Sequence, residues 1–166
     1  GQLDAAVECY EKAIAIQPGY TEAHNNLGNA LKDLGQLDAA IEYYKKALSF
    51  RPDYAEAHNN LGIAFKQLGQ LDAAIKSYER LLALKPDDAE THNNLGIVYM
   101  QLNQTDVALK CYEKALTLKP NYADAHANRG NVMKRLKHMD EALASYKSAI
   151  ALDPELVFIL GDIYVT

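Results

Sequence analysis

Apolar residues recur along most of the chain at three- and four-residue spacing, which is the pattern of amphipathic helices. In the segment 21–34 this spacing joins Ala23, Leu27 and Leu31, and a Gly-Gln step follows at 35–36. A second apolar pattern then runs to residue 50, shortly before Pro52. Proline lacks an amide proton and clashes with the preceding turn, so it ends this pattern. The pattern therefore predicts two helices joined by a tight turn.

The predicted helix pair recurs along the chain with a fixed period of 34 residues. Five residue types keep their place in it: Gly28, Gly62, Gly96 and Gly130; Pro18, Pro52, Pro86, Pro120 and Pro154; His24, His58, His92 and His126; Tyr10, Tyr44, Tyr78, Tyr112 and Tyr146; Ala6, Ala40, Ala74, Ala108 and Ala142. A period of this length indicates stacked supersecondary units. One helix pair cannot bury its apolar face alone, so neighbouring pairs must cover it.

These positions resemble the signature of the tetratricopeptide repeat (TPR) family. The third unit carries the signature at His92, Leu95-Gly96, Tyr99, Ala108, Tyr112 and Pro120, with histidine in place of the first aromatic residue. The resemblance implies an all-α fold, a right-handed α-solenoid of stacked antiparallel helix pairs. It also implies one array over residues 1–166, with full repeats at 21–54, 55–88, 89–122 and 123–156.

The two ends of the array depart from this register. Residues 1–20 match only the second helix of a repeat, and residues 157–166 are expected to form a partial repeat or a capping helix. Gly161 and Tyr164 echo the repeat signature, but Gly161 follows Gly130 by 31 residues instead of 34. Incomplete end repeats predict head-to-tail association between copies of the chain, that is, a homo-oligomer.

The turn inside each pair also changes along the chain. Gly35 and Gly69 give way to Asn103 and Lys137 at the equivalent positions. Glycine adopts a left-handed backbone freely, asparagine tolerates it, and lysine does so less well. Lysine at position 137 is therefore the least suited of these residues to a left-handed turn.

A polar stripe follows the first helix of every pair, opposite the apolar one. The resemblance to TPR proteins implies that this helix lines a concave groove for peptides. The expected peptide-binding residues are Asn25, Asn26, Asn29, Asn59, Asn60, Ile63, Lys66, Asn93, Asn94, Ile97, Asn128, Asn131 and Lys134.

Within this stripe, one asparagine per repeat forms a ladder: Asn26, Asn60, Asn94 and Asn128. An amide side chain both donates and accepts hydrogen bonds, which suits the backbone of an extended peptide. Replacing Asn60 and Asn94 is then expected to abolish binding at little cost in stability. The alternative is that these amides only bridge adjacent helices, and the sequence leaves both roles open.

An acidic residue opens the stripe of each repeat: Glu22, Glu56, Glu90 and Asp124. The whole chain carries a formal net charge of −5. This balance disfavours nucleic acid and terminal carboxylates, and it favours a neutral or basic protein segment as partner.

No catalytic constellation emerges from these repeating positions. The histidines lie one repeat apart, about 10 Å, and cannot converge on one metal ion. We expect no metal, no cofactor, no enzyme activity, no membrane span and a cytoplasmic location.

Three functions remain open. The first is a protein–protein interaction scaffold that binds an extended peptide. The second is a self-assembly scaffold joined through the incomplete end repeats. The third comes from a resemblance of the asparagine ladder to the TPR arm of O-GlcNAc transferases, which implies a substrate-recognition arm of a larger glycosyltransferase-like enzyme.

Overall fold

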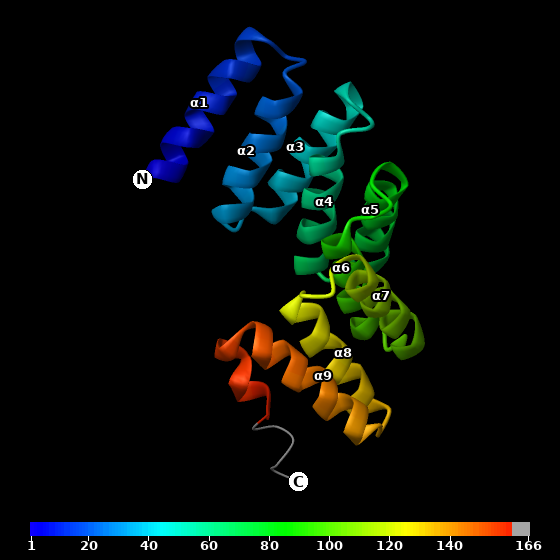
Figure 1. Cartoon of the computed structure of the whole chain (residues 1–166). Helices are drawn as coiled ribbons and strands as arrows, with labels where there is room; N and C mark the ends of the chain where they lie inside the picture. Colours follow the sequence, from blue (N-terminus) through cyan, green and yellow to red (C-terminus); the bar gives the residue numbers. More distant parts are fainter. Residues whose placement is uncertain (161–166) are drawn as a thin grey trace. The chain divides into compact units, whose positions relative to one another are not determined.

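The computed structural model describes residues 1–160, which form nine α-helices and one short 3-10 helix and contain no strand (Figure 1). The helices are α1 (Gln2–Ile16), α2 (Thr21–Asp33), α3 (Leu37–Phe50), α4 (Ala55–Gln67), α5 (Leu71–Leu84), α6 (Ala89–Gln101), α7 (Thr105–Leu118), α8 (Ala123–Arg135), α9 (Met139–Leu152) and the 3-10 helix η1 (Pro154–Leu160). The prediction of an all-helical fold is confirmed for the described residues. None of these helices is long and apolar enough to cross a membrane.

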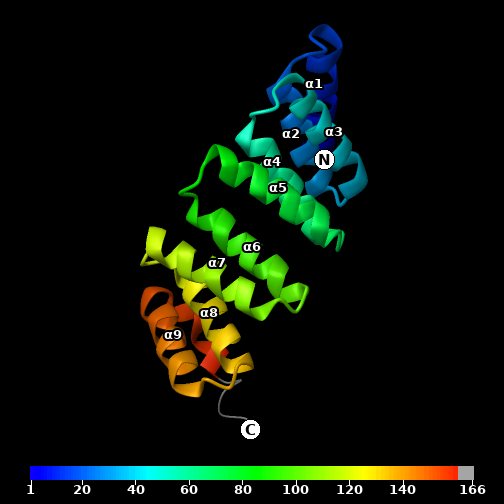
Figure 2. The same cartoon turned by 90° about the vertical axis from the view of Figure 1, so that its right-hand side faces the viewer.

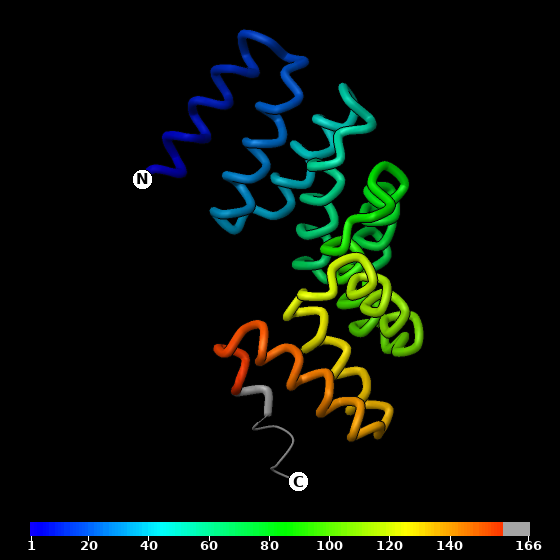
Figure 3. Tube along the Cα trace, viewed as in Figure 1, coloured from blue at the N-terminus to red at the C-terminus, as the bar shows by residue number. Residues whose placement is uncertain are grey.

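The chain divides into two compact units, one at Gly1–Pro86 and one that begins at Asp87. In the first unit, α2 packs on α3 and α4 packs on α5, while α1 packs on α2. In the second unit, α6 packs on α7 and α8 packs on α9. The chain reverses direction at the turn inside each pair, so the paired helices run antiparallel (Figures 2 and 3).

The helices of each pair meet where a glycine of the first helix faces a tyrosine of the second. A methyl group added at Gly62 would lie 2.4 Å from Cε1 of Tyr78. The same geometry holds at Gly28, where the distance to Cε1 of Tyr44 would be 2.5 Å. Carbon atoms do not approach so closely without displacement, because the interior is already close-packed. Glycine is therefore required for the ring to lie flat against the neighbouring backbone.

We expect Gly62→Ala to lower the free energy of unfolding by about 1–3 kcal/mol, because the added methyl group overpacks the contact with the ring of Tyr78. Urea denaturation followed by circular dichroism measures the loss. Gly19→Ala is the matched control, since its added methyl group would meet Phe50 at an ordinary 3.6 Å. Equal stability of the two variants would contradict the packing argument.

The turns between paired helices have the left-handed backbone that the sequence predicts. The φ angle is +77° at Gly35 and +71° at Gly69. It is +60° at Asn103 and +65° at Lys137, which are the positive-φ residues other than glycine in the described chain. Lysine has a β-carbon that crowds the backbone in this region, so the last turn is strained.

Lys137→Gly is expected to raise the free energy of unfolding by about 0.5–1 kcal/mol, because relief of strain exceeds the entropy that glycine costs. The midpoint of guanidinium denaturation should rise accordingly. Asn103→Gly serves as the comparison and should gain less, because asparagine tolerates the left-handed region. A loss of stability in Lys137→Gly would show that the turn is not strained.

A contact between each of two histidine rings and a proline carbonyl group explains the fixed distance between these residues in the sequence. The Nε2 atom of His24 lies 2.8 Å from the carbonyl oxygen of Pro18, six residues earlier. The same contact joins His126 to Pro120 at 2.8 Å. The ring of His24 also stacks on Tyr43 and on Phe50, with ring centroids 6.0 and 5.5 Å away. His24 and His126 thus each join the start of a helix pair to the preceding connection.

The ends of the described chain differ from the internal repeats. Helix α1 contains no buried residue, and the side chain of Ile16 is almost fully exposed. Residues 154–160 form a 3-10 helix and not the first α-helix of another repeat. Proline at its start and the three-residue change of register account for this difference. Gly161 and Tyr164 lie outside the described residues, so end-to-end association remains a prediction.

Candidate functional site

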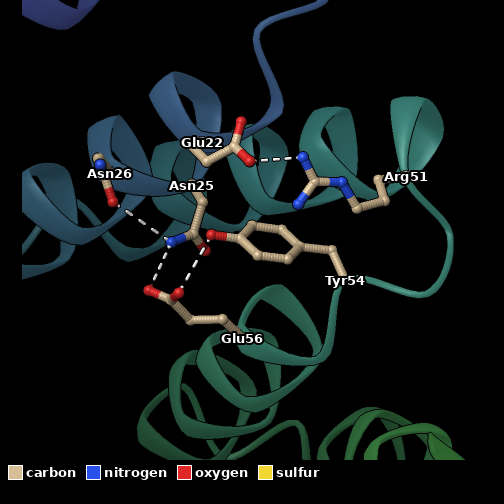
Figure 4. A network of polar contacts seen from close by, with 6 residues as sticks. All are labelled: Glu22, Asn25, Asn26, Arg51, Tyr54 and Glu56. Atoms are coloured by element: carbon tan, nitrogen blue, oxygen red, sulfur yellow. Dashed lines mark hydrogen bonds and ion pairs between the residues drawn. The ribbon is translucent and has the colours of Figure 1, made fainter.

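In the first unit, polar side chains connect α2 to α4 and to the segment between α3 and α4 (Figure 4). The guanidinium group of Arg51 forms an ion pair with Glu22, and this hydrogen bond lowers the pKa of Glu22. The hydroxyl group of Tyr54 donates to Oε2 of Glu56 at 3.1 Å. Burial, followed by the contact with Glu56, raises the pKa of Tyr54 to about 12, so this hydroxyl group stays protonated and donates. The network fixes the start of α4 against α2.

Asn25 lies at the centre of this network and is completely buried, with 0% of its surface exposed. Its Nδ2 atom donates to Oε1 of Glu56 at 2.9 Å and lies 3.5 Å from the side-chain oxygen of Asn26. Its Oδ1 atom accepts a hydrogen bond of 3.0 Å from Nδ2 of Asn60. Asn60 belongs to the following repeat, so this bond joins two successive helix pairs.

The second unit repeats this bridge between α6 and α8. Nδ2 of Asn128 donates to Oδ1 of Asn93 at 3.0 Å. The side chain of Tyr122, from the connection before α8, lies close to Asn93. Burial, with Glu90 and Asp124 nearby, raises the pKa of Tyr122 to about 12. Both units therefore use an asparagine pair, 35 residues apart, to join successive repeats.

The structure separates the predicted peptide-binding residues into two groups. Asn25, Asn60 and Asn93 are buried, with 0%, 8% and 4% of their surface exposed, and all three take part in the bridges between repeats. The structure thus revises the expectation that Asn60 matters little for stability. The other predicted residues are half-buried or exposed: Asn26, Asn29, Asn59, Ile63, Lys66, Asn94, Ile97, Asn128, Asn131 and Lys134.

Asn25→Ala is expected to lower the free energy of unfolding by about 1–3 kcal/mol, because it leaves the buried amide of Asn60 without its acceptor. Thermal melting and urea denaturation measure this loss. Asn26→Ala is the matched control, since Asn26 is half-buried and its contact with Asn25 is a weak one of 3.5 Å. If both variants lose the same stability, the hydrogen bond between Asn25 and Asn60 does not stabilise the fold.

A trough runs along α6 and α8 within the second unit. Its central part has a volume of about 530 Å³ and is lined by Glu90, Asn93, Asn94, Ile97, Tyr122, Asp124, Ala127, Asn128, Asn131 and Leu156. A hollow of about 250 Å³ shares three of these residues and adds Met100, Gln101 and Tyr112. A third hollow, of about 520 Å³, adds Asp87, Asp88, Ala89 and Lys119 at the other end. Shared walls make the three hollows one continuous surface.

The charge of this trough is uneven. The walls at one end carry the carboxylates of Asp87, Asp88, Glu90 and Asp124 and the ammonium group of Lys119. The Nζ atom of Lys119 lies over the ring of Tyr122, 4.8 Å from its centroid. The far end is formed largely by Ile97 and Met100. The trough therefore changes from acidic, through amide-lined, to apolar along its length.

The amides of the trough retain hydrogen-bonding capacity. Asn128 uses its nitrogen for Asn93, and its oxygen accepts nothing from the described residues. The side-chain oxygen of Asn131 accepts a hydrogen bond of 2.8 Å from the hydroxyl group of Tyr146, so its side-chain nitrogen remains available to donate. Asn94 has no hydrogen-bond partner within residues 1–160. Three adjacent amides thus offer both donors and acceptors to a ligand.

Sequence reasoning found the asparagines and Ile97 but missed other residues that line the trough. Tyr122 comes from the connection before α8, Tyr112 comes from the second helix of a pair, and Leu156 comes from η1. The polar stripe of the first helices contained no signal for them. No group of three metal-binding side chains occurs in the described part of the chain.

Solved structures similar to this chain are TPR proteins or proteins of the same fold. A structure of MamA is 30% identical, with a TM-score of 0.87, and the match covers 93% of this chain and 91% of that one. MamA from Desulfovibrio magneticus RS-1 is 22% identical, with a TM-score of 0.86 and coverage of 93% and 88%. YrrB, described as a TPR protein with an unusual peptide-binding site, is 22% identical, with a TM-score of 0.83 and coverage of 99% and 84%.

Family models match almost the whole chain, whereas a search of curated proteins finds no match. The TPR repeat model matches residues 1–35, 28–69, 62–103 and 98–137. The tetratricopeptide repeat model matches residues 123–156. The helix pairs, the glycine–tyrosine contacts and these matches agree, and the chain belongs to the tetratricopeptide-repeat family.

Proposed function

We propose that this TPR scaffold binds an extended peptide segment of a partner protein in the trough of its second unit. Membership of the family supports the broader role of a protein–protein interaction scaffold. The observation that carries the finer proposal is the set of amides with unused hydrogen-bonding groups at Asn94, Asn128 and Asn131. They line the central part of the trough, which has a volume of about 530 Å³.

An extended peptide suits this arrangement. It advances about 3.3 Å per residue and presents a donor and an acceptor at each residue. Neighbouring helices lie about 10 Å apart, so amides on α6 and α8 are suited to hold every third peptide residue through its backbone. Such contacts depend little on the peptide side chains, which leaves selectivity to the two ends of the trough.

The acidic end supports a neutral or basic segment as the ligand. Four carboxylates and one ammonium group leave an excess of negative charge there. Complementary charge speeds association and disfavours acidic partners.

The test is selection of binders from a random dodecapeptide library, followed by fluorescence anisotropy with the complete chain. We expect the selected peptides to be neutral or basic. Asn94→Ala should lower their affinity about three- to tenfold, because hydrogen bonds to the peptide backbone are lost. Asp124→Lys should weaken basic peptides further, and added salt should reduce this difference.

Asn26→Ala is the matched control, because it removes the equivalent amide from the first unit and should leave the dissociation constant unchanged. Melting temperatures are compared throughout, so that loss of binding is separated from loss of folding. The proposal fails if the library gives no binder, or if every selected peptide binds Asn94→Ala as tightly as the unaltered chain.

A further inference from the structure

The tyrosines that pack on the repeat glycines do not all have the same hydrogen bonds. In the first repeat, the hydroxyl group of Tyr44 donates to Oδ1 of Asn29 at 2.8 Å. In the fourth, Tyr146 donates to Asn131 at 2.8 Å. The asparagine in both cases directly follows the glycine under the ring. The asparagine therefore provides the hydrogen-bond acceptor for the hydroxyl group of the buried tyrosine.

The third repeat has isoleucine at this position. Ile97 follows Gly96, against which the ring of Tyr112 packs. An isoleucine side chain cannot accept a hydrogen bond, and no residue in the described chain hydrogen-bonds to the hydroxyl group of Tyr112. Tyr112 is only 2% exposed, and it lines the hollow of about 250 Å³ at the apolar end of the trough.

The hydroxyl group of Tyr112 is unpaired within the described chain and can be reached from the hollow that the residue lines, so this hollow is suited to a ligand that supplies a hydrogen-bond acceptor. Burial raises the pKa of Tyr112 well above its ordinary value, which keeps the group protonated and able to donate. The side chains of Ile97 and Met100 pack against the hydrophobic cluster that contains Tyr112, and they give the hollow an apolar wall.

The remaining polar groups define the chemistry of this ligand. The free oxygen of Asn128 accepts a hydrogen bond, whereas the free nitrogen of Asn131 donates one. A neutral primary amide has both complementary groups. A carboxylate would leave the Asn128 oxygen unsatisfied and would lie near Glu90 and Asp124, which line the adjoining part of the trough. An apolar side chain would leave all the polar groups unsatisfied.

We propose that this hollow binds the side chain of a glutamine in the peptide, with the methylene groups against Ile97 and Met100 and the amide oxygen on the Tyr112 hydroxyl group. The amide nitrogen then donates to Asn128. This inference rests on the proposed function, since the glutamine belongs to a segment that lies in the same trough. It adds a selective position to contacts that are otherwise made with the peptide backbone.

The first experiment uses N-acetyl-glutamine N-methylamide as a probe, with the glutamate and norleucine equivalents for comparison. Methyl resonances of Ile97 and Met100 are followed by NMR during titration of the complete chain. We expect saturable shifts with the glutamine probe and at least threefold weaker binding of the other two. Equal binding of the three probes, or no shift at these methyl groups with the glutamine probe, would overturn the proposal.

Two variants test the role of the hydroxyl group. Tyr112→Phe should weaken the glutamine probe about three- to tenfold and should not lower the melting temperature, because the lost group has no internal partner. Ile97→Asn should weaken the probe as well, since it restores the internal acceptor seen in the first and fourth repeats. Tyr44→Phe is the control: it should lower the melting temperature and leave the probe affinity unchanged. Unchanged binding in Tyr112→Phe would contradict the assignment.

The peptide library separates this inference from the broader proposal. If selected peptides require Asn94 but show no preference for glutamine, peptide binding stands and the glutamine pocket is wrong. If the probe binds at Ile97 and Met100 and the library gives no binder, the pocket stands and the peptide groove is wrong.

Discussion

The contact between a glycine and a tyrosine ring inside each helix pair is the constraint on which the rest of the structure depends. At Gly28 and Gly62 there is no space for even one methyl group between backbone and ring. This approach fixes how closely the paired helices pack, and it carries the tyrosine hydroxyl group to the residue that follows the glycine. Where that next residue is asparagine, as at Asn29 and Asn131, it accepts a hydrogen bond from the hydroxyl group. At Tyr112, a packing constraint thus places a polar group in the wall of a hollow.

A second set of contacts joins one pair to the next. The bridges Asn25–Asn60 and Asn93–Asn128 bury amide groups that the sequence presents as part of a uniform polar stripe. One stripe therefore contains amides that join repeats and neighbouring amides with unused hydrogen-bonding groups. Asn128 belongs to both sets, because it uses its nitrogen for the bridge and retains its oxygen.

Much of this fold could be predicted from the spacing of a few residue types. Columns of glycine, alanine and proline indicated each helix pair, because close packing and helix termination leave few residues able to replace them. The left-handed turn at Lys137 was predictable for the same reason. The burial of Asn25 was not, since adjacent asparagines look equivalent in sequence and only the position of the next repeat distinguishes them. The change from Asn29 to Ile97 was visible, but its meaning depended on knowing where the tyrosine hydroxyl group lies.

The bridging asparagines also bear on how the chain folds. Each bridge connects residues 35 positions apart, so it closes a loop of one repeat and no more. The entropy lost in closing a loop rises only slowly with its length, and a short loop is closed quickly. The hydrogen bond between two successive repeats can therefore form as soon as both helix pairs have left the ribosome, before distant parts of the sequence have been synthesised.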